Sequence, residues 1–142
     1  MEWVSIRDRL ADADVLWTAG RREGALLSVL VAITAAARDE HPKLGDGEAF
    51  RTFLSDHHSW TIQVEHRGKL VTVEQLMWKW LRCELAHRSA LPTDVQLDVL
   101  DDNPEVLRIQ AGGAPAYCVR LSNGWYWWLR RLVEDRAKEV RS

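Results

Sequence analysis

Arg82 and His87 are the two residues whose types and spacing most directly suggest chemistry, because they lie five positions apart near the end of a predicted helix. An imidazole can take up or release a proton near neutral pH. A guanidinium stays charged and can contact two oxygens of a phosphate group. The pair therefore suits a reaction at a phosphate in which negative charge grows. The alternative interpretation is that neither residue is catalytic. Arg82 is then a solvated charge on the helix surface, and His87 stabilises the C-terminal end of the helix by interacting with the helix dipole.

The predicted helix that carries the pair covers about residues 72–88. Thr72 and Gln75 have the spacing of a capping box, which is typical of a helix start. On an ideal α-helix, Arg82 and His87 point about 140° apart and lie about 7.5 Å apart along the axis. Within one chain, the two side chains therefore do not lie next to each other on one face of the helix. We expect a composite cleft to which a second copy of the chain contributes.

One side of this helix is apolar over an arc of roughly 220°, which is far wider than one packing contact requires. We expect two surfaces to cover the arc, one from the same chain and one from a second copy, since a two-fold dimer uses a self-complementary patch. The pattern therefore predicts a homodimer. The apolar residues of the arc are Val73, Leu76, Met77, Trp78, Trp80, Leu81, Cys83 and Leu85.

The segment Arg82-Cys83-Glu84-Leu85-Ala86-His87 resembles the Arg-x4-His motif of the HEPN superfamily, which lies late on a bundle helix. The predicted helix pair around residues 11–38, with Trp17, Gly20 and an alanine-rich second helix, also resembles the start of a HEPN bundle. The resemblance implies a mostly α, HEPN-like helical bundle that forms a homodimer.

The resemblance also implies an activity, which is metal-independent cleavage of RNA between two protomers. A ribose 2′-hydroxyl would attack its own phosphate, with His87 moving the proton and Arg82 stabilising the phosphorane. The products would be a 2′,3′-cyclic phosphate and a 5′-hydroxyl, and DNA would be excluded because it lacks the attacking hydroxyl. The implied role is a toxin or phage-defence effector that needs no cofactor and that an antitoxin or another partner protein can bind.

The alternative function is a non-catalytic HEPN-like dimer that binds a partner protein, such as a nucleotidyltransferase, through its apolar surface. Two positions depart from the family pattern. Cys83 stands where the family often has Asn, Asp or His, and Ser89 stands where some HEPN toxins carry tyrosine. Neutralisation by nucleotide transfer onto that tyrosine is therefore unsupported.

Glu84 and Cys83 are secondary candidates for the site. Glu84 falls near the middle of the apolar arc, where an unpaired carboxylate is costly, so we expect it to meet an arginine or to face the cleft. Cys83 and His87 have a spacing that can hold zinc on a helix, but the chain has no second tight ligand pair. We therefore predict no metal site.

Further contacts to RNA are predicted for basic and aromatic residues around the site and in the last helix. Trp125 and Trp128 fall on the apolar face of that helix, whereas Tyr126 and Trp127 either pack against the strands or offer RNA bases a stacking surface. A basic turn at residues 66–69 is a further place where phosphate can be contacted. The predicted RNA contacts are Lys79, Arg88, Trp127, Arg130 and Arg131.

The remaining elements follow from hydrophobic periodicity. Steps of three and four predict helices over about 3–20, 21–42 and 50–54, and a last helix after Gly124, with a short extended segment near 62–67. A period of two predicts a three-stranded antiparallel meander inserted at about 94–121, which makes the fold class α+β with a mostly helical bundle. The three strands are expected around Val95–Val99, Leu107–Ala111 and Tyr117–Leu121.

Composition limits the class of protein. The chain has 142 residues, a formal net charge of −2 and 46% hydrophobic residues, as expected of one globular domain over 1–142. The longest apolar stretch, residues 25–37, is shorter than the roughly 20 residues of a membrane-spanning helix. Only two cysteines are present and the N-terminus has no signal-peptide pattern, so we expect a cytoplasmic protein.

Overall fold

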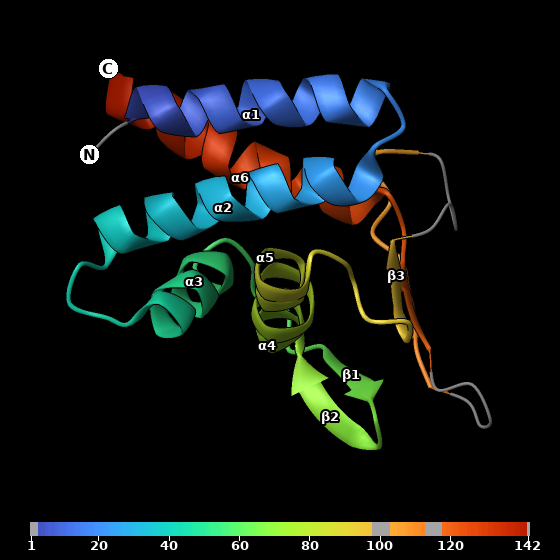
Figure 1. The fold of residues 1–142 in the computed structure, drawn as a ribbon. Coiled ribbons are helices and arrows are strands. Elements are labelled where there is room, and N and C mark those ends of the chain that lie inside the picture. The colour runs from blue at the N-terminus through green and yellow to red at the C-terminus, as the bar shows by residue number, and fades with distance from the viewer. Residues whose placement is uncertain (1–2, 98–102, 113–117, 142) are drawn as a thin grey trace. The chain divides into compact units, whose positions relative to one another are not determined.

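A computed structural model of the chain describes residues 3–97, 103–112 and 118–141, with the backbone alone for 139–141. The described chain is mostly helical, as predicted (Figure 1). It forms two compact units, Met1–His58 with Leu129–Ser142 and Ser59–Trp128, while a single domain over 1–142 stays a prediction. Within the described residues, no helix combines the length and apolar character needed to cross a membrane.

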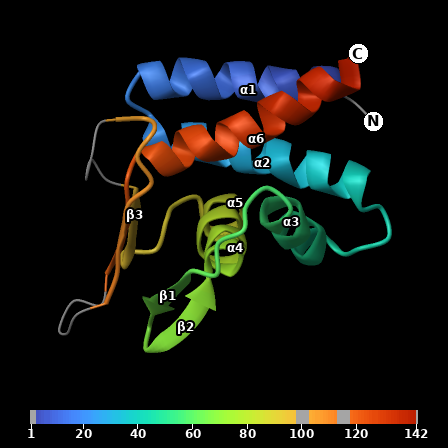
Figure 2. The ribbon, with the colours of Figure 1, turned by 180° about the vertical axis from the view of Figure 1, so that it is seen from behind.

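The first unit is helical throughout. It contains α1 (Trp3–Thr18), α2 (Arg22–Glu40), α3 (Asp46–Ser55) and the later part of α6 (Gly124–Arg141). Helices α1 and α2 lie side by side and run in opposite directions, and both views show α6 beside them (Figures 1 and 2). The turn between α1 and α2 has Gly20 at φ 79°, a left-handed conformation that glycine adopts without steric cost.

Helix α2 is the central helix of this unit, as its apolar sequence predicted. Residues around most of its circumference are buried, and its alanines let neighbouring helices approach closely. The predicted apolar faces of α1 and α3 are buried as well. The largest fully buried side chains of this core are Leu26, Leu30, Ile33, Phe50, Phe53, Leu54 and Leu129.

The second unit begins with a hairpin, β1 (Gln63–His66) and β2 (Lys69–Thr72), where the sequence predicted a short extended segment. Its two-residue turn has Arg67 at φ 55° and Gly68 at φ 79°. Two positive φ values in succession characterise the type I′ turn, which matches the twist of a hairpin. Directly after β2, the Thr72 side chain accepts a hydrogen bond from the Gln75 amide, so the predicted helix start is confirmed.

The helical stretch that follows is α-helical only at its ends. Helix α4 (Val73–Gln75) leads into a π-helical segment, η1 (Leu76–Cys83), and then into α5 (Glu84–Arg88). The assumption of 100° per residue is therefore wrong over η1, because its hydrogen bonds join residues five apart. The apolar arc divides accordingly, since Val73, Leu76, Met77, Leu81 and Leu85 are buried whereas Trp78, Trp80 and Cys83 are half-buried.

The second sheet corrects the predicted antiparallel meander. Its three strands are β3 (Val95–Leu97), β4 (Ile109–Gln110) and β5 (Val119–Leu121), in the order β3-β5-β4. Strand β5 is parallel to β3 and antiparallel to β4. Alternation of apolar and polar residues marks a strand but is the same for either direction of pairing, so the sequence did not reveal the neighbour. The predicted strand positions Val99 and Tyr117 lie outside the described residues.

The start of α6 is joined to the segment before β4. The Ser122 hydroxyl donates to the Val106 carbonyl and accepts from the Arg108 amide, both at 2.9 Å. The Trp125 indole donates to the Arg108 carbonyl at 3.1 Å. A Cβ at Gly124 would lie 1.9 Å from the Val106 carbonyl oxygen, so only glycine fits this approach.

Candidate functional site

Arg82 lies in the last turn of η1 and is half-buried. The centre of its guanidinium is 5.0 Å from the centre of the Trp78 ring, which is the arrangement of a cation–π contact. Its Nε is buried and has no hydrogen-bond partner among the described residues. A buried donor without a partner is costly, so Arg82 keeps a hydrogen-bonding capacity that this part of the chain does not use.

His87 lies in the last turn of α5, and its side chain is exposed. In the part of the chain that the structure describes, no hydrogen bond joins His87 to Arg82. The imidazole is therefore open to a substrate from solvent, whereas Arg82 is held against an aromatic ring. A composite cleft with a second copy stays a prediction.

Glu84 pairs with an arginine, which is one of the two environments predicted for it. One of its carboxylate oxygens lies 3.3 Å from Nε of Arg88, one helical turn later. This ion pair partly neutralises Arg88, whose side chain is otherwise exposed. Cys83 is a half-buried free thiol.

A second group of polar side chains lies where the β1–β2 hairpin meets η1. Arg67 Nε donates to Asp94 Oδ2 at 2.7 Å, and Arg67 Nη2 donates to Asp94 Oδ1 at 3.1 Å. His66 is 3% exposed, and its Nε2 lies 3.0 Å from the same Asp94 Oδ2. Trp80 contacts both hairpin residues, with ring centres 4.5 Å apart for His66 and the Arg67 guanidinium 4.2 Å above its ring.

This environment lowers the pKa values of both Asp94 and His66, which favours the charged form of the carboxyl and the neutral form of the imidazole. Hydrogen bonds from Arg67 lower the pKa of the Asp94 carboxyl, which keeps it negatively charged. Burial lowers the pKa of His66, and the positive charges of Arg67 and Lys79 act in the same direction against the opposing effect of Asp94. His66 is therefore neutral at pH 7, and its role is that of a buried polar neighbour rather than a cation.

Arg67 occupies a backbone conformation that its residue type disfavours. At the first central position of a type I′ turn, asparagine, aspartate and glycine are preferred because φ is positive there. A non-glycine residue at positive φ costs on the order of 1 kcal/mol. The contacts of the Arg67 side chain with Asp94 and Trp80 offset this cost.

A cavity of about 310 Å³ opens beside this group. Its lining combines the inward face of the hairpin, where His66 lies opposite Lys69, with one side of the following helical stretch. The Lys79 ammonium lies 5.0 Å from the centre of the Trp80 ring. The lining residues are His66, Arg67, Lys69, Val71, Gln75, Lys79 and Trp80.

The sequence indicated only part of this group. The sequence predicts the basic turn at residues 66–69 and Lys79 as separate contacts to RNA, and both line one cavity. Asp94 was not singled out, because it lies 27 residues after Arg67 and ahead of a different strand. Trp80 was assigned to the apolar arc, whereas it lies against the hairpin.

The other predicted RNA contacts are found on α6. Arg130 is held by two hydrogen bonds of 2.8 Å to Asp14, and it also pairs with Glu134. Its guanidinium is therefore engaged by carboxylates of the first unit. Trp127 is half-buried with its ring against Tyr126, and Arg131 is half-buried.

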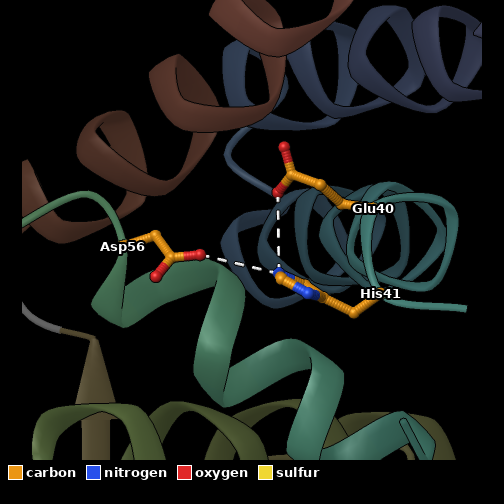
Figure 3. A group of neighbouring side chains, drawn as sticks. All are labelled: Glu40, His41 and Asp56. Carbon is orange, nitrogen blue, oxygen red and sulfur yellow. Dashed lines mark ion pairs between the residues drawn. The ribbon is translucent and has the colours of Figure 1, made fainter. Parts of the chain in front are cut away.

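One group of side chains in the described residues has the spacing of metal ligands, and it does not include Cys83 or His87. Glu40, His41 and Asp56 have ligand atoms within 4.8 Å of one another. Figure 3 shows the His41 ring between the two carboxylates, with Nε2 at 3.9 Å from Glu40 and 3.5 Å from Asp56. Arg136 lies 3.2 Å from the other Glu40 oxygen. These contacts are those of an ion-pair network that joins the ends of α2 and α3.

Comparison with known proteins adds no further constraint. No protein-family model, curated protein or solved structure matches the chain.

Proposed function

We propose that this chain is a metal-independent endoribonuclease of the HEPN type that acts as a homodimer, with Arg82 and His87 at the reacting phosphate. The observation that carries the proposal is the state of Arg82, whose guanidinium is held over Trp78 while its buried Nε has no partner in the described part of the chain. A phosphate oxygen is an acceptor that matches this donor. A preorganised charge of this kind stabilises a transition state more than a mobile one.

The proposed reaction needs no group outside the protein. One His87 imidazole takes the proton of a ribose 2′-hydroxyl as the 2′-oxygen forms a bond to phosphorus. The bond from phosphorus to the 5′-oxygen breaks, and that oxygen receives a proton from the second His87 of the dimer. Arg82 stabilises the added negative charge on the phosphorane. The products are a 2′,3′-cyclic phosphate and a 5′-hydroxyl.

The test is cleavage of a labelled single-stranded RNA in EDTA. The wild-type protein is expected to cleave it, and His87→Gln and Arg82→Lys are each expected to reduce the rate at least about 100-fold. His57→Gln is the matched control, because His57 is also an exposed histidine near a helix end. Cleavage that EDTA abolishes, or that survives His87→Gln, would contradict the proposal.

The proposed biological role is that of a cytoplasmic toxin or defence effector. Expression of the wild-type chain in a bacterial host is then expected to arrest growth, and His87→Gln is expected to relieve the arrest at equal protein level. A partner protein that acts as antitoxin would relieve the arrest by the wild-type chain as well.

A second candidate function is a non-catalytic module that binds a partner protein. The observation in its favour is the exposure of two apolar side chains, Leu70 on the outer side of the hairpin at 66% and Ile62 just before β1 at 46%. A partner protein would cover these side chains as part of a contiguous apolar patch, which is the kind of surface that marks an interaction site. A wild-type protein that leaves RNA intact, together with partner binding lost in Leu70→Glu, would favour this function.

A further inference from the structure

The cavity between the β1–β2 hairpin and η1 has a lining of one charge sign. Arg67, Lys69 and Lys79 contribute three cationic side chains, and none of the seven lining side chains is acidic. Asp94 balances Arg67 from outside the lining. Lys69 and Lys79 have no acidic partner among the described residues. The cavity therefore attracts anions in a protein whose overall charge is slightly negative.

Two of these cations lie close to one aromatic ring. The Arg67 guanidinium is 4.2 Å and the Lys79 ammonium 5.0 Å from the centre of the Trp80 indole. The ring quadrupole attracts each cation, but the two positive charges repel each other. An anion between them would relieve this repulsion, whereas a cation or a neutral apolar ligand would not.

The arginine of this cavity is held in position before any ligand binds. Two of its five N–H donors are used by Asp94, and the remaining donors are available to an acceptor. The positive φ of Arg67 and its stacking on Trp80 restrict the side chain further. A preorganised guanidinium loses little conformational entropy on binding, and its planar arrangement of donors matches phosphate oxygens.

Lys69 completes the arrangement through the hairpin register. It lies directly opposite His66, on the same face as the Val64 and Val71 pair. Its ammonium therefore comes from the strand side of the cavity, whereas Lys79 comes from the helix side. The cavity volume of about 310 Å³ is enough for a phosphate group with an attached sugar.

We propose that this cavity binds a phosphate group of the RNA backbone, held by Arg67, Lys69 and Lys79 beside Trp80. The choice of RNA as the source rests on the proposed function, whereas the preference for a phosphate ester rests on the cavity alone. A phosphate bound here is separate from the reacting phosphate at Arg82 and His87. The site would therefore anchor the strand without taking part in the bond-breaking step.

The test measures binding of a single-stranded 2′-O-methyl RNA, which has no free 2′-hydroxyl and cannot be cleaved. Fluorescence anisotropy is followed over a range of salt concentrations for the wild type and for Lys69→Ala/Lys79→Ala. Both lysines are exposed, so the double variant is expected to fold, and circular dichroism checks this. The matched control is Arg21→Ala/Lys43→Ala, which removes the same charge from exposed positions of the first unit.

The expected result is an affinity at least tenfold lower for Lys69→Ala/Lys79→Ala and less than twofold lower for the control. The slope of log K against log salt should fall in magnitude by about 1.4, because each lost contact to a single strand contributes roughly 0.7. Equal affinities for the two double variants would overturn the proposal. Binding of inorganic phosphate or a nucleoside monophosphate without binding of the RNA would overturn the choice of RNA as the source.

The same measurement separates this site from the proposed reaction. Cleavage of the corresponding unmodified RNA is measured on the same protein preparations. Lysine-dependent binding by a wild-type protein that cleaves no RNA would contradict the proposed function and leave the phosphate site supported. Cleavage by the wild type together with unchanged binding by Lys69→Ala/Lys79→Ala would do the reverse.

Discussion

Arg67 and Asp94 form a two-pronged ion pair across 27 residues of sequence, with donor–acceptor distances of 2.7 and 3.1 Å. The pair joins the turn of the β1–β2 hairpin to the residue that precedes β3. The same Asp94 oxygen that accepts from Arg67 Nε lies 3.0 Å from the buried His66. One carboxylate thereby positions the arginine of the cavity beside Trp80 and contacts the buried histidine of that cavity.

Asp94→Asn is expected to lower the free energy of unfolding by about 1 kcal/mol, because it removes the charge of a partly buried pair whose arginine remains solvent-accessible. Asp12→Asn is the control, since Asp12 forms an exposed pair with Arg9 one helical turn away, and its effect should be below about 0.5 kcal/mol. Urea denaturation measures both values. Equal changes in the free energy of unfolding would show that the Asp94 pair stabilises the fold no more than an exposed ion pair does.

Stability should depend on pH through His66. Its pKa is lowered from 6.5 in the folded protein, so the unfolded chain binds more protons as the pH falls below that value. The contribution of the neutral His66 to the free energy of unfolding is therefore complete above pH 6.5. This contribution is lost as the pH falls from 6.5 through the lowered pKa of the folded protein. The pKa of Asp94 is lowered, so that carboxyl titrates at more acidic pH.

The measurement is urea denaturation between about pH 5.5 and pH 7.5 for the wild type and His66→Phe. The phenyl ring keeps the aromatic contact with Trp80 but does not titrate. We expect the variant to lose part of the pH dependence in this window. A slope as steep as that of the wild type would exclude His66 as its source.

Gly124→Ala is expected to destabilise the protein by about 2 kcal/mol or more, because the new methyl group would meet the Val106 carbonyl oxygen, a backbone atom that cannot rotate away. Gly24→Ala is the control of opposite sign. The nearest atom to a Cβ at Gly24 is a flexible leucine methyl at 3.4 Å, and alanine is preferred within a helix by roughly 0.5–1 kcal/mol. Thermal unfolding of the two variants should therefore shift in opposite directions.

Arg130→Met is expected to cost about 1–3 kcal/mol, because it leaves Asp14 and Glu134 without the guanidinium that pairs with both. Arg130 is 16% exposed and lowers the pKa of Glu134 by donating a hydrogen bond to it. Arg9→Met removes an exposed pair and should have little effect. The same two variants also test the predicted RNA contact, since affinity for RNA should fall only for Arg130→Met if Arg130 binds phosphate.

Local patterns were sufficient to place the helices. Helices α1, α2 and α3, the capping residue Thr72 and the start of α6 follow from hydrophobic periodicity and capping chemistry, which act over a few residues. The ion pair of Glu84 with an arginine was also foreseeable, because a carboxylate near apolar neighbours needs a partner. The ribonuclease and homodimer hypotheses stay predictions.

Local sequence patterns therefore predicted the approximate positions and order of the helices and a list of residues capable of chemistry. The packed chain, in contrast, reveals that β5 lies between β3 and β4, that residues 76–83 form a π-helix, and that Asp94 binds Arg67. The physical reason is range. Periodicity and caps are set by neighbours in the chain, whereas strand partners and distant ion pairs depend on which surfaces meet when the chain packs.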